Sequence, residues 1–408
     1  MNSPLSLYRG LPKPIYVLFF ATVINGVGIF VYPFLTLYLT QRLGYSALQA
    51  GTFMTLASVL YIPGSFIGSK LADTIGRKPV VVVFQLLMDI CFILAGIFEG
   101  QTIVVYLILL ALFFDGAVDP AREALKTDVT TRENRQVAFS FIYLGHNLGY
   151  AIGPVIAGYL FFTAPRWIFY GNAGFGILSV LLILWKVKES KPSEELIEES
   201  QSWDSTEKGE RGSLIKALLS RPRLIFFALS VTFFSYAYSQ TLFALPLLTN
   251  QLFNEGGAVL YGKMMALNGI VVVLFNPILV SSLRRFHPLA NSSFSGLLYA
   301  LGFGLFAFAT KEWAFLLLTI IYTLGEIIAA TNEQYYVANN TPISHRGRFS
   351  AILPILMGTG HAIAPVTGGL IIEQYSMYTL WVSTAAAALI GAFMIFCLYL
   401  AEKNKKPL

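Results

Sequence analysis

The chain has 408 residues, of which 56% are hydrophobic and only 12% are charged, and its formal net charge is +6. A soluble domain typically carries about 25% charged residues, so this composition excludes a soluble protein and indicates an integral membrane protein. Two cysteines, Cys91 and Cys397, lie in apolar stretches and are too few for a disulfide framework or a metal cluster.

A membrane-spanning helix needs roughly 20 mostly apolar residues. Twelve stretches meet this requirement, and we expect them to span the membrane as helices. They lie at about 14–40, 47–72, 78–98, 102–125, 135–163, 167–186, 221–250, 258–283, 290–309, 312–336, 347–372 and 376–401. The apolar run of the first stretch is too long for the core of a typical signal peptide, so we interpret it as a retained helix.

The distribution of positive charge predicts the orientation in the membrane. If the N-terminus is cytoplasmic, 24 of the 28 Lys and Arg residues fall on the cytoplasmic side, and only Arg42, Arg166, Lys263 and Lys311 lie in outer loops. Lys and Arg concentrate in cytoplasmic loops, so both termini are expected in the cytoplasm and the protein in the cell membrane. Residues 188–213 are charged and rich in Ser and Glu, which is typical of a solvated linker.

An internal repeat divides the chain into two similar halves. "GYAIGPVIAG" at 149–158 matches "GHAIAPVTGG" at 360–369 with six identities in ten, and the same offset of 211 residues carries Arg135 onto Arg346. Parallel duplication of a six-helix half is an architecture of secondary transporters. We therefore predict an all-α membrane protein with two pseudo-symmetric six-helix bundles, at 1–187 and 217–408, joined by a cytoplasmic linker at 188–216.

The matched stretches are rich in small residues, which let helices approach closely. We expect them to form a packing surface on which the halves rock, with ordinary helix packing as the alternative. The residues concerned are Gly149, Gly153, Pro154, Gly158, Gly360, Pro365 and Gly369.

The stretch "GSKLADTIGRKP" at 68–79 is polar although apolar segments flank it on both sides. Gly76 tolerates positive φ and would allow a tight reversal between helices. A carboxylate at Asp73 near the N-terminus of the helix at 347–372 would be favoured by about 0.3–1 kcal/mol. The alternative is that the stretch only supplies cytoplasmic positive charge, which would explain Lys70, Arg77 and Lys78 but neither Asp73 nor Gly76.

These motifs resemble those of the major facilitator superfamily. The polar stretch is similar to the family's loop signature G-x-L-a-D-r-x-G-r-k between helices two and three. The matching positions are Gly68, Leu71, Asp73, Gly76, Arg77 and Lys78. "GYAIGPVIAG" resembles the helix-five signature of the antiporter branch, and "YTLGE" at 322–326 resembles helix ten of bacterial multidrug/proton antiporters. The resemblance implies the major facilitator fold, and it implies that Asp73 and Arg77 latch the two halves on the cytoplasmic face.

The sequence departs from the family at Leu112, four residues before Gly116, where the usual proton-relay arginine is missing.

Charged residues within the fourth segment form one stripe. Asp115, Asp119, Arg122 and Lys126 are spaced by four, three and four residues, so they share a helix face, and Asp119 and Arg122 are placed to pair. A charge inside the membrane costs roughly 2.5–3.5 kcal/mol and usually faces a cavity or a partner. An equal alternative is that Arg122, Glu123 and Lys126 are simply the snorkelling cytoplasmic end of the helix.

The tenth segment carries Glu326 near its middle, with Glu333 and Tyr322 on the same face. We expect Glu326 to bind the coupling proton in a central cavity, with Asp115 as its partner from the other half. Asp89 is a weaker candidate, because the third helix is usually peripheral in the family. The polar side chains expected to line the cavity are Asn25, Tyr143, His146, Asn147, Tyr150, Gln240, Asn268, Tyr322 and His361.

No P-loop, HExxH motif or Cys/His metal cluster occurs, so we expect neither an enzyme nor a cofactor. A receptor or structural membrane protein would have no reason to duplicate six helices around buried acids. The resemblance implies a proton-coupled antiporter that exports lipophilic, often cationic compounds by alternating access. The alternative is a more specific exporter or a proton symporter for a metabolite, peptide or lipid. The expected partners are a small-molecule substrate, protons and the lipid bilayer, with no nucleic acid, and the expected state is a monomer.

Overall fold

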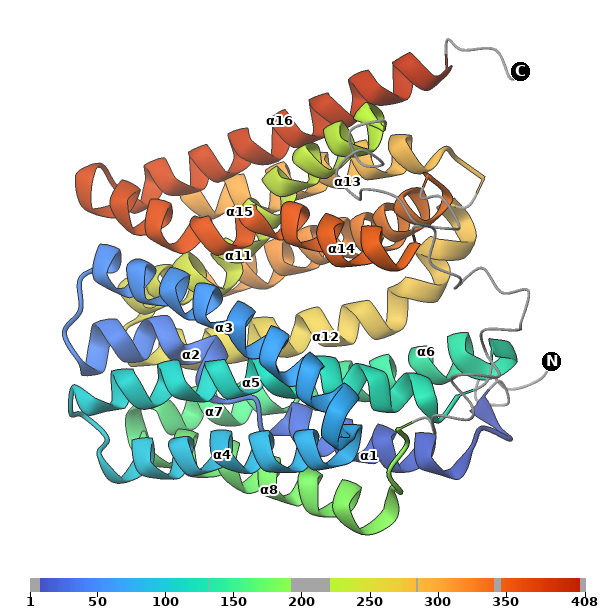
Figure 1. The fold of residues 1–408 in the computed structure, drawn as a ribbon. Coiled ribbons are helices and arrows are strands. Elements are labelled where there is room, and N and C mark those ends of the chain that lie inside the picture. Colours follow the sequence, from blue (N-terminus) through green and yellow to red (C-terminus); the bar gives the residue numbers. More distant parts are fainter. Residues whose placement is uncertain (1–7, 131, 192–220, 284, 341–345, 404–408) are drawn as a thin grey trace. The chain divides into compact units, whose positions relative to one another are not determined.

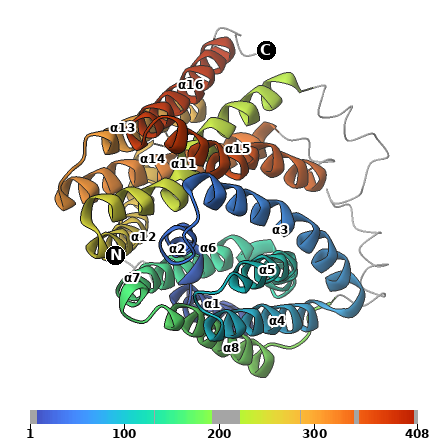
Figure 2. The same ribbon diagram turned by 90° about the vertical axis from the view of Figure 1, so that its left-hand side faces the viewer.

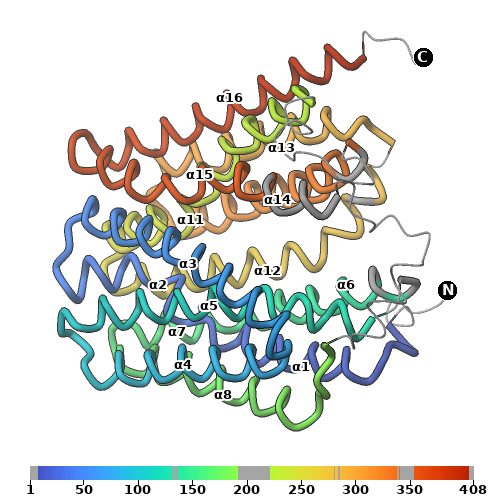
Figure 3. Tube along the Cα trace, in the orientation of Figure 1, coloured from blue at the N-terminus to red at the C-terminus, as the bar shows by residue number. Residues whose placement is uncertain are grey.

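The computed structural model describes residues 8–130, 132–191, 221–283, 285–340 and 346–403 (Figure 3). Helices occupy every predicted segment within these ranges. In the first half they are α1 Lys13–Val27, α2 Val31–Leu37, a π-helical turn Tyr38–Arg42, α3 Ala47–Ile75, α4 Arg77–Ile97, α5 Ile103–Asp128, α6 Arg132–Tyr150, α7 Gly153–Thr163 and α8 Arg166–Lys186. In the second half they are α11 Pro222–Phe253, α12 Glu255–Leu283, α13 Pro288–Gly304, a 3₁₀ turn Leu305–Ala307, α14 Glu312–Asn340, α15 Arg346–Gln374 and α16 Met377–Lys403 (Figure 1).

Among the described residues, ten helices are long and apolar enough to cross a membrane. The two remaining predicted segments are α11, which is 32 residues long but polar in its middle, and the pair α6–α7. Helices are expected here because a chain in lipid must satisfy its backbone hydrogen bonds internally. Many apolar side chains on the helices are accordingly exposed, including Phe66 and Phe393, as lipid contact requires.

Two segments predicted as single helices are interrupted. The first is divided at 28–30, where the Asn172 side chain of α8 accepts from the backbone N–H groups of Phe30 and Val31, both at 3.2 Å. The fifth is divided at 151–152, directly before Gly153 and Pro154. Pro154 has no N–H to donate to the carbonyl of Tyr150, so the α-helical ladder cannot run through this point.

The chain forms two compact units. Unit 1 contains Met1–Tyr45, Phe53–Glu194 and Pro246–Ile270, and unit 2 contains Ser46–Thr52, Glu195–Leu245 and Val271–Leu408. The start of α3 thus packs within unit 2, and the end of α11 with the start of α12 packs within unit 1. Most of the predicted linker 188–216 lies outside the described residues, so its bounds and those of the bundles stay a prediction.

Each unit has its own buried core. In unit 1, α4 packs on α5 and α8, and α1 packs on α6 and α8 (Figure 2). Ile15, Val80, Val118, Ile142 and Ile183 bring these helices together in one apolar cluster. In unit 2, α13 packs between α14 and α16. Aromatic side chains dominate that core, and the Phe303 ring lies parallel to both Tyr322 and Trp381.

Candidate functional site

The polar stretch at 68–79 is almost entirely helical, which corrects the expectation of a loop. Helix α3 continues to Ile75 and α4 begins at Arg77, so the reversal is confined to Gly76. The φ of Gly76 is +113°, a value that L side chains rarely adopt. Gly68 lies inside α3, where a Cβ atom would come within 2.5 Å of the Ala117 Cα on α5. The motif therefore positions α3 tightly against α5 and turns the chain sharply into α4.

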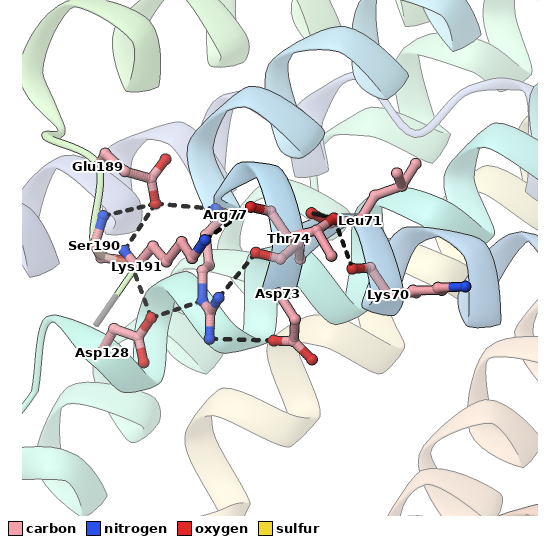
Figure 4. Close-up of polar contacts among 10 residues, drawn as sticks. Lys70, Leu71, Asp73, Thr74, Arg77, Asp128, Glu189, Ser190 and Lys191 are labelled. Atoms are coloured by element: carbon pink, nitrogen blue, oxygen red, sulfur yellow. Dashed lines mark hydrogen bonds and ion pairs between the residues drawn. The ribbon is translucent and has the colours of Figure 1, made fainter. Parts of the chain in front are cut away.

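The guanidinium of Arg77 joins three elements at this reversal (Figure 4). Its Nε donates to Asp128 at the end of α5 at 3.0 Å, and its Nη1 donates to the Ala72 carbonyl at 2.8 Å. The Nη2 lies 3.3 Å from the Asp73 carboxylate. The Arg77 side chain is only 12% exposed, whereas Asp73 is 70% exposed. Arg77 thus holds the ends of α3 and α5 at the start of α4, whereas most of the Asp73 side chain is open to solvent.

Glu189 lies just after α8 and caps the N-terminus of α4, although it is far from that helix in sequence. Its carboxylate accepts from the backbone N–H groups of Arg77 at 2.9 Å and Lys78 at 3.0 Å. It also accepts from the backbone N–H groups of Ser190 and Lys191. Burial disfavours the charged form, but these four donors together hold the pKa of Glu189 below its usual value. The start of the linker is thereby fastened to the reversal (Figure 4).

Replacing Glu189 with alanine is expected to destabilise this corner by about 1 kcal/mol, the usual effect of losing a helix cap. Because the folded-state pKa is lowered, the stabilisation is present above the ordinary glutamate pKa and is lost as pH falls through the lowered value. Thermal unfolding in detergent at several pH values measures this. A difference between wild type and Glu189→Ala that persists undiminished at the most acidic pH would contradict the assignment.

The charged stripe of α5 is partly buried in unit 1. Asp119 accepts a short hydrogen bond from the Tyr61 hydroxyl of α3, and its Oδ1 lies 3.6 Å from Arg122 Nη1. The predicted pairing of Asp119 with Arg122 is therefore present. Arg122 also donates from Nη2 to the Gln85 side chain of α4 at 2.8 Å. Arg122 thus points into the bundle, which corrects the snorkelling alternative for this residue. Helix α5 runs unbroken through Pro120.

Polar residues of α6 lie near this stripe and near α12. The His146 ring stacks on the Tyr150 ring, and the charges of Lys126, Arg122 and Asp119 act on it. The Tyr150 hydroxyl contacts Met265 Sδ of α12 at 3.7 Å. Three further predicted residues are placed as follows: Asn147 is buried and donates to the Tyr143 carbonyl, Tyr143 is exposed, and Asn268 is buried in α12. Asn25 is half-buried in α1.

The predicted glycine surface of the fifth segment contacts two partners rather than one. A Cβ atom at Gly149 would come within 2.8 Å of Gly26 Cα in α1, and one at Gly153 within 2.6 Å of the Val27 carbonyl oxygen. A Cβ atom at Gly158 would instead lie 2.6 Å from the Ala258 carbonyl oxygen of α12.

The corresponding glycines of α15 also make close contacts, within unit 2. Gly360 packs against α11, where a Cβ atom would lie 2.9 Å from the Tyr236 backbone nitrogen. A Cβ atom at Gly369 would lie 2.5 Å from the Ala47 carbonyl oxygen at the start of α3. Unlike Pro154, Pro365 is accommodated inside a continuous helix. The two halves of the repeat therefore share the close contacts but not the break.

The internal repeat relates the acids of α14 to charged residues of α5. The offset of 211 residues carries Asp115 onto Glu326 and Arg122 onto Glu333. Glu326 and Glu333 are both half-buried in the continuous helix Glu312–Asn340, and both charges act on the buried Tyr299 of α13. The Glu333 Oε1 is buried and has no hydrogen-bond partner among the described residues.

Three polar residues of unit 2 differ in burial and in their contacts. Tyr322 was expected to line a cavity but is fully buried, because its ring stacks on Phe303 with centroids 5.0 Å apart. Gln240 is also fully buried and donates to the Ala364 carbonyl at 3.2 Å. His361 is half-buried, and its backbone carbonyl accepts from Ser239.

Four residues that complete these arrangements were not predicted from the sequence, namely Tyr61, Gln85, Asp128 and Glu189. Gln85 and Tyr61 lie on helices adjacent to α5, and only the packing of α3 and α4 on α5 brings them to the stripe. Asp128 and Glu189 are separated from Arg77 by 51 and 112 residues. No local spacing could have indicated either contact.

Comparison with known proteins identifies the family. The model of the Major Facilitator Superfamily matches residues 18–352 and 292–408. The chain therefore belongs to this superfamily, and it is a multi-pass membrane transporter rather than an enzyme. The expectation of the fold is thereby confirmed.

Individual relatives are distant. The chain is 22% identical to a Na⁺, Li⁺, K⁺/H⁺ antiporter of Planococcus maritimus over 83% of this chain and 84% of the relative. It is 22% identical to the multidrug resistance protein MdtH of Edwardsiella ictaluri over 94% and 93%. Among solved structures, a POT family transporter in complex with a peptide conjugate has a TM-score of 0.76 at 16% identity, covering 98% of both chains. The nucleoside transporter NupG has a TM-score of 0.76 at 16% identity over 94% and 99%. These structures share the fold.

Proposed function

We propose that this chain is a proton-coupled antiporter of the cell membrane that exports lipophilic, often cationic compounds by alternating access. The observation that carries the proposal is the placement of acids inside apolar membrane helices. Asp115 and Asp119 on α5 and Glu326 on α14 are partly buried, and the repeat relates Asp115 to Glu326. Acids in such places are costly for a membrane protein and mark ion or proton pathways.

Competition at one carboxylate is sufficient for coupling. A proton or a cationic substrate neutralises Glu326, but the two do not do so together. Binding of the cation from the cytoplasm displaces the proton to the cytoplasm, and binding of a proton from outside displaces the cation outward. The net result is one proton in for one cation out, with no further energy source. Each ligand weakens the binding of the other by the same factor, as linkage requires.

The relatives support antiport in part. Two of the distant relatives are named as an alkali cation/proton antiporter and as a multidrug resistance protein. The first name fits a site that exchanges a positive charge for protons, and the second fits a transporter of drug-like compounds. The first of these names also favours a second candidate function, the exchange of Na⁺, Li⁺ or K⁺ for protons. A specific exporter or symporter of a metabolite, peptide or lipid is the remaining alternative.

A transport screen in proteoliposomes separates these functions. Purified protein is reconstituted and challenged with lipophilic cationic dyes, with neutral dyes of similar size, and with Na⁺ or K⁺, each with and without an imposed pH gradient. The proposal expects gradient-dependent accumulation of cationic dyes. Gradient-dependent movement of Na⁺ or K⁺ without dye transport would favour the second candidate and exclude the first.

Asp73 is proposed to act as the cytoplasmic latch that the family resemblance implies. Its carboxylate is largely exposed although Arg77 lies beside it, so it remains available to a second partner. Asp73→Asn is expected to depopulate the outward-facing state while leaving folding intact, because a latch of about 0.3–1 kcal/mol shifts a conformational equilibrium by less than tenfold. Spin-label distances between cytoplasmic ends of the two halves measure this shift. The same distance distribution in mutant and wild type at every pH would exclude a latch at Asp73.

A further inference from the structure

Asp89 of α4 is a fully buried carboxyl group that the proposed coupling does not use. Its exposed fraction is 0%. The Oδ1 accepts from the Gln85 amide one turn earlier, at 3.1 Å. The Oδ2 is buried and has no hydrogen-bond partner among the described residues. Such a carboxyl group is half satisfied, in a place where unsatisfied polar atoms are costly.

The site is shaped to hold this side chain. Helix α8 faces Asp89 with Gly176, and a Cβ atom at Gly176 would lie 2.8 Å from both the Cγ and the Oδ2 of Asp89. Any other residue at this position would collide with the carboxyl group. The repeat places Ala300 and Gly296 in the second half where Asp89 and Gln85 stand in the first. The fold therefore does not require this pair, and the first half alone possesses it.

Gln85 connects Asp89 to the charged stripe of α5. Its Oε1 accepts from Arg122 Nη2 at 2.8 Å, while Nη1 of the same guanidinium lies 3.6 Å from Asp119. Arg122 therefore lies between two carboxyl groups, one buried at α4 and one on the stripe. Helices α5 and α8 pack on α4 (Figure 2). Among the described residues of these helices, the charged groups that act on Asp89 are Arg122 and Asp115. Helix α8 contributes no charged group to this contact among its described residues, since it presents Gly176.

We propose that Asp89 is a proton-binding site of the first unit and that its protonation shifts Arg122, which contacts both Gln85 and Asp119 in this structure, toward Asp119. This inference rests on the proposed proton coupling. In the protonated acid, the Oδ2 hydroxyl can donate to the carbonyl of Gln85 one turn earlier, as short polar side chains do in helices. The ionised acid lacks a donor at Oδ2 and draws Arg122 toward Gln85 and away from Asp119. Protonation of Asp89 releases Arg122 to Asp119. The proton comes from water and returns to water, and no other group changes its proton count.

Infrared difference spectroscopy tests the proton directly. The C=O stretch of a protonated carboxyl group is recorded on the purified protein in lipid nanodiscs, during a pH titration. The wild type is expected to show, at neutral pH, a component of this band that is missing from Asp89→Asn, while any components from Asp115, Glu326 and Glu333 remain in both. Asp73→Asn is the matched control, because the Asp73 carboxyl group is largely exposed and should contribute no such band at neutral pH. Identical spectra for wild type and Asp89→Asn at every pH would overturn the proposal.

A second variant keeps the proposal testable if Asp89→Asn does not fold. Gln85→Leu keeps Asp89 but removes its amide donor, and the protonated-carboxyl band is expected to move to higher frequency. A band in which no component moves in Gln85→Leu or is missing from Asp89→Asn refutes the assignment. The outcome is separable from the proposed function, since the spectrum requires no transport. If no component of the band depends on Asp89 while proton-driven transport is intact, the inference about Asp89 is wrong and the proposed function stands.

Discussion

Replacing Glu326 with glutamine is expected to abolish proton-coupled transport of a cationic substrate. Glutamine keeps the size of the side chain and a hydrogen-bonding oxygen, but it can neither bind a proton nor carry a negative charge. A coupling free energy of about 1–3 kcal/mol corresponds to roughly 5- to 150-fold between the affinities for the two ligands, and it vanishes in the mutant. Accumulation driven by a pH gradient in proteoliposomes should fall to the level of protein-free liposomes. Downhill leakage of the substrate should persist.

Glu312→Gln is the matched control for this experiment. Glu312 stands at the exposed start of the same helix, so the substitution repeats the chemical change on α14 without touching a partly buried acid. The control should transport at the wild-type rate. If Glu326→Gln also retains pH-driven transport of several substrates at the wild-type rate, the proton site lies elsewhere.

Gly68→Ala is expected to be the most destabilising single change in the polar motif. The new Cβ atom would lie 2.5 Å from the Ala117 Cα and 2.6 Å from its carbonyl carbon, and these backbone atoms of α5 cannot yield as a flexible side chain does. Helices α3 and α5 must separate to make room for it. The resulting loss of unfolding free energy should exceed the roughly 1–3 kcal/mol that overpacking typically costs. We expect a large drop in thermal stability in detergent and a low yield of folded protein.

Gly174→Ala provides the comparison for this substitution. Gly174 also lies within a helix, α8, but a Cβ atom there would meet nothing within 4 Å. Alanine favours a helix over glycine by about 1 kcal/mol, so this variant should be as stable as wild type or slightly more so. Equal stability of the Gly68 and Gly174 variants would contradict the close packing of α3 on α5.

The membrane helices could be predicted from the sequence because apolar length is a property of each segment alone. The stripe of α5 was likewise predictable, since residues three and four apart share a helix face, and the structure pairs Asp119 with Arg122. The acids of α14 were found by the same local reasoning. The relation of Asp115 to Glu326 also lies in the sequence, through the offset that aligns the two glycine-rich stretches.

Contacts between helices were beyond the reach of local patterns. The reversal at Gly76 was expected to occupy a loop, but α3 continues to Ile75 and α4 begins at Arg77, and the spacing did not indicate the close contact of Gly68 with α5. The cap on α4 comes from Glu189, which neither charge nor spacing distinguished from other linker residues. Asp89 was expected to be a weaker candidate for the proton site, because its helix is usually peripheral in the family. Its setting became visible only when Gln85, Arg122 and Gly176 were found around it.

Proton movement caused by the substrate is the most direct test of the proposed antiport. Proteoliposomes that contain a pH-sensitive dye are prepared with equal pH on both sides, and an outward gradient of a cationic substrate is then imposed. The account predicts that the lumen acidifies as the substrate leaves and that Glu326→Gln eliminates this signal. Substrate efflux at full rate in the wild type with no change in lumenal pH, even when charge is compensated by a potassium ionophore, would contradict it.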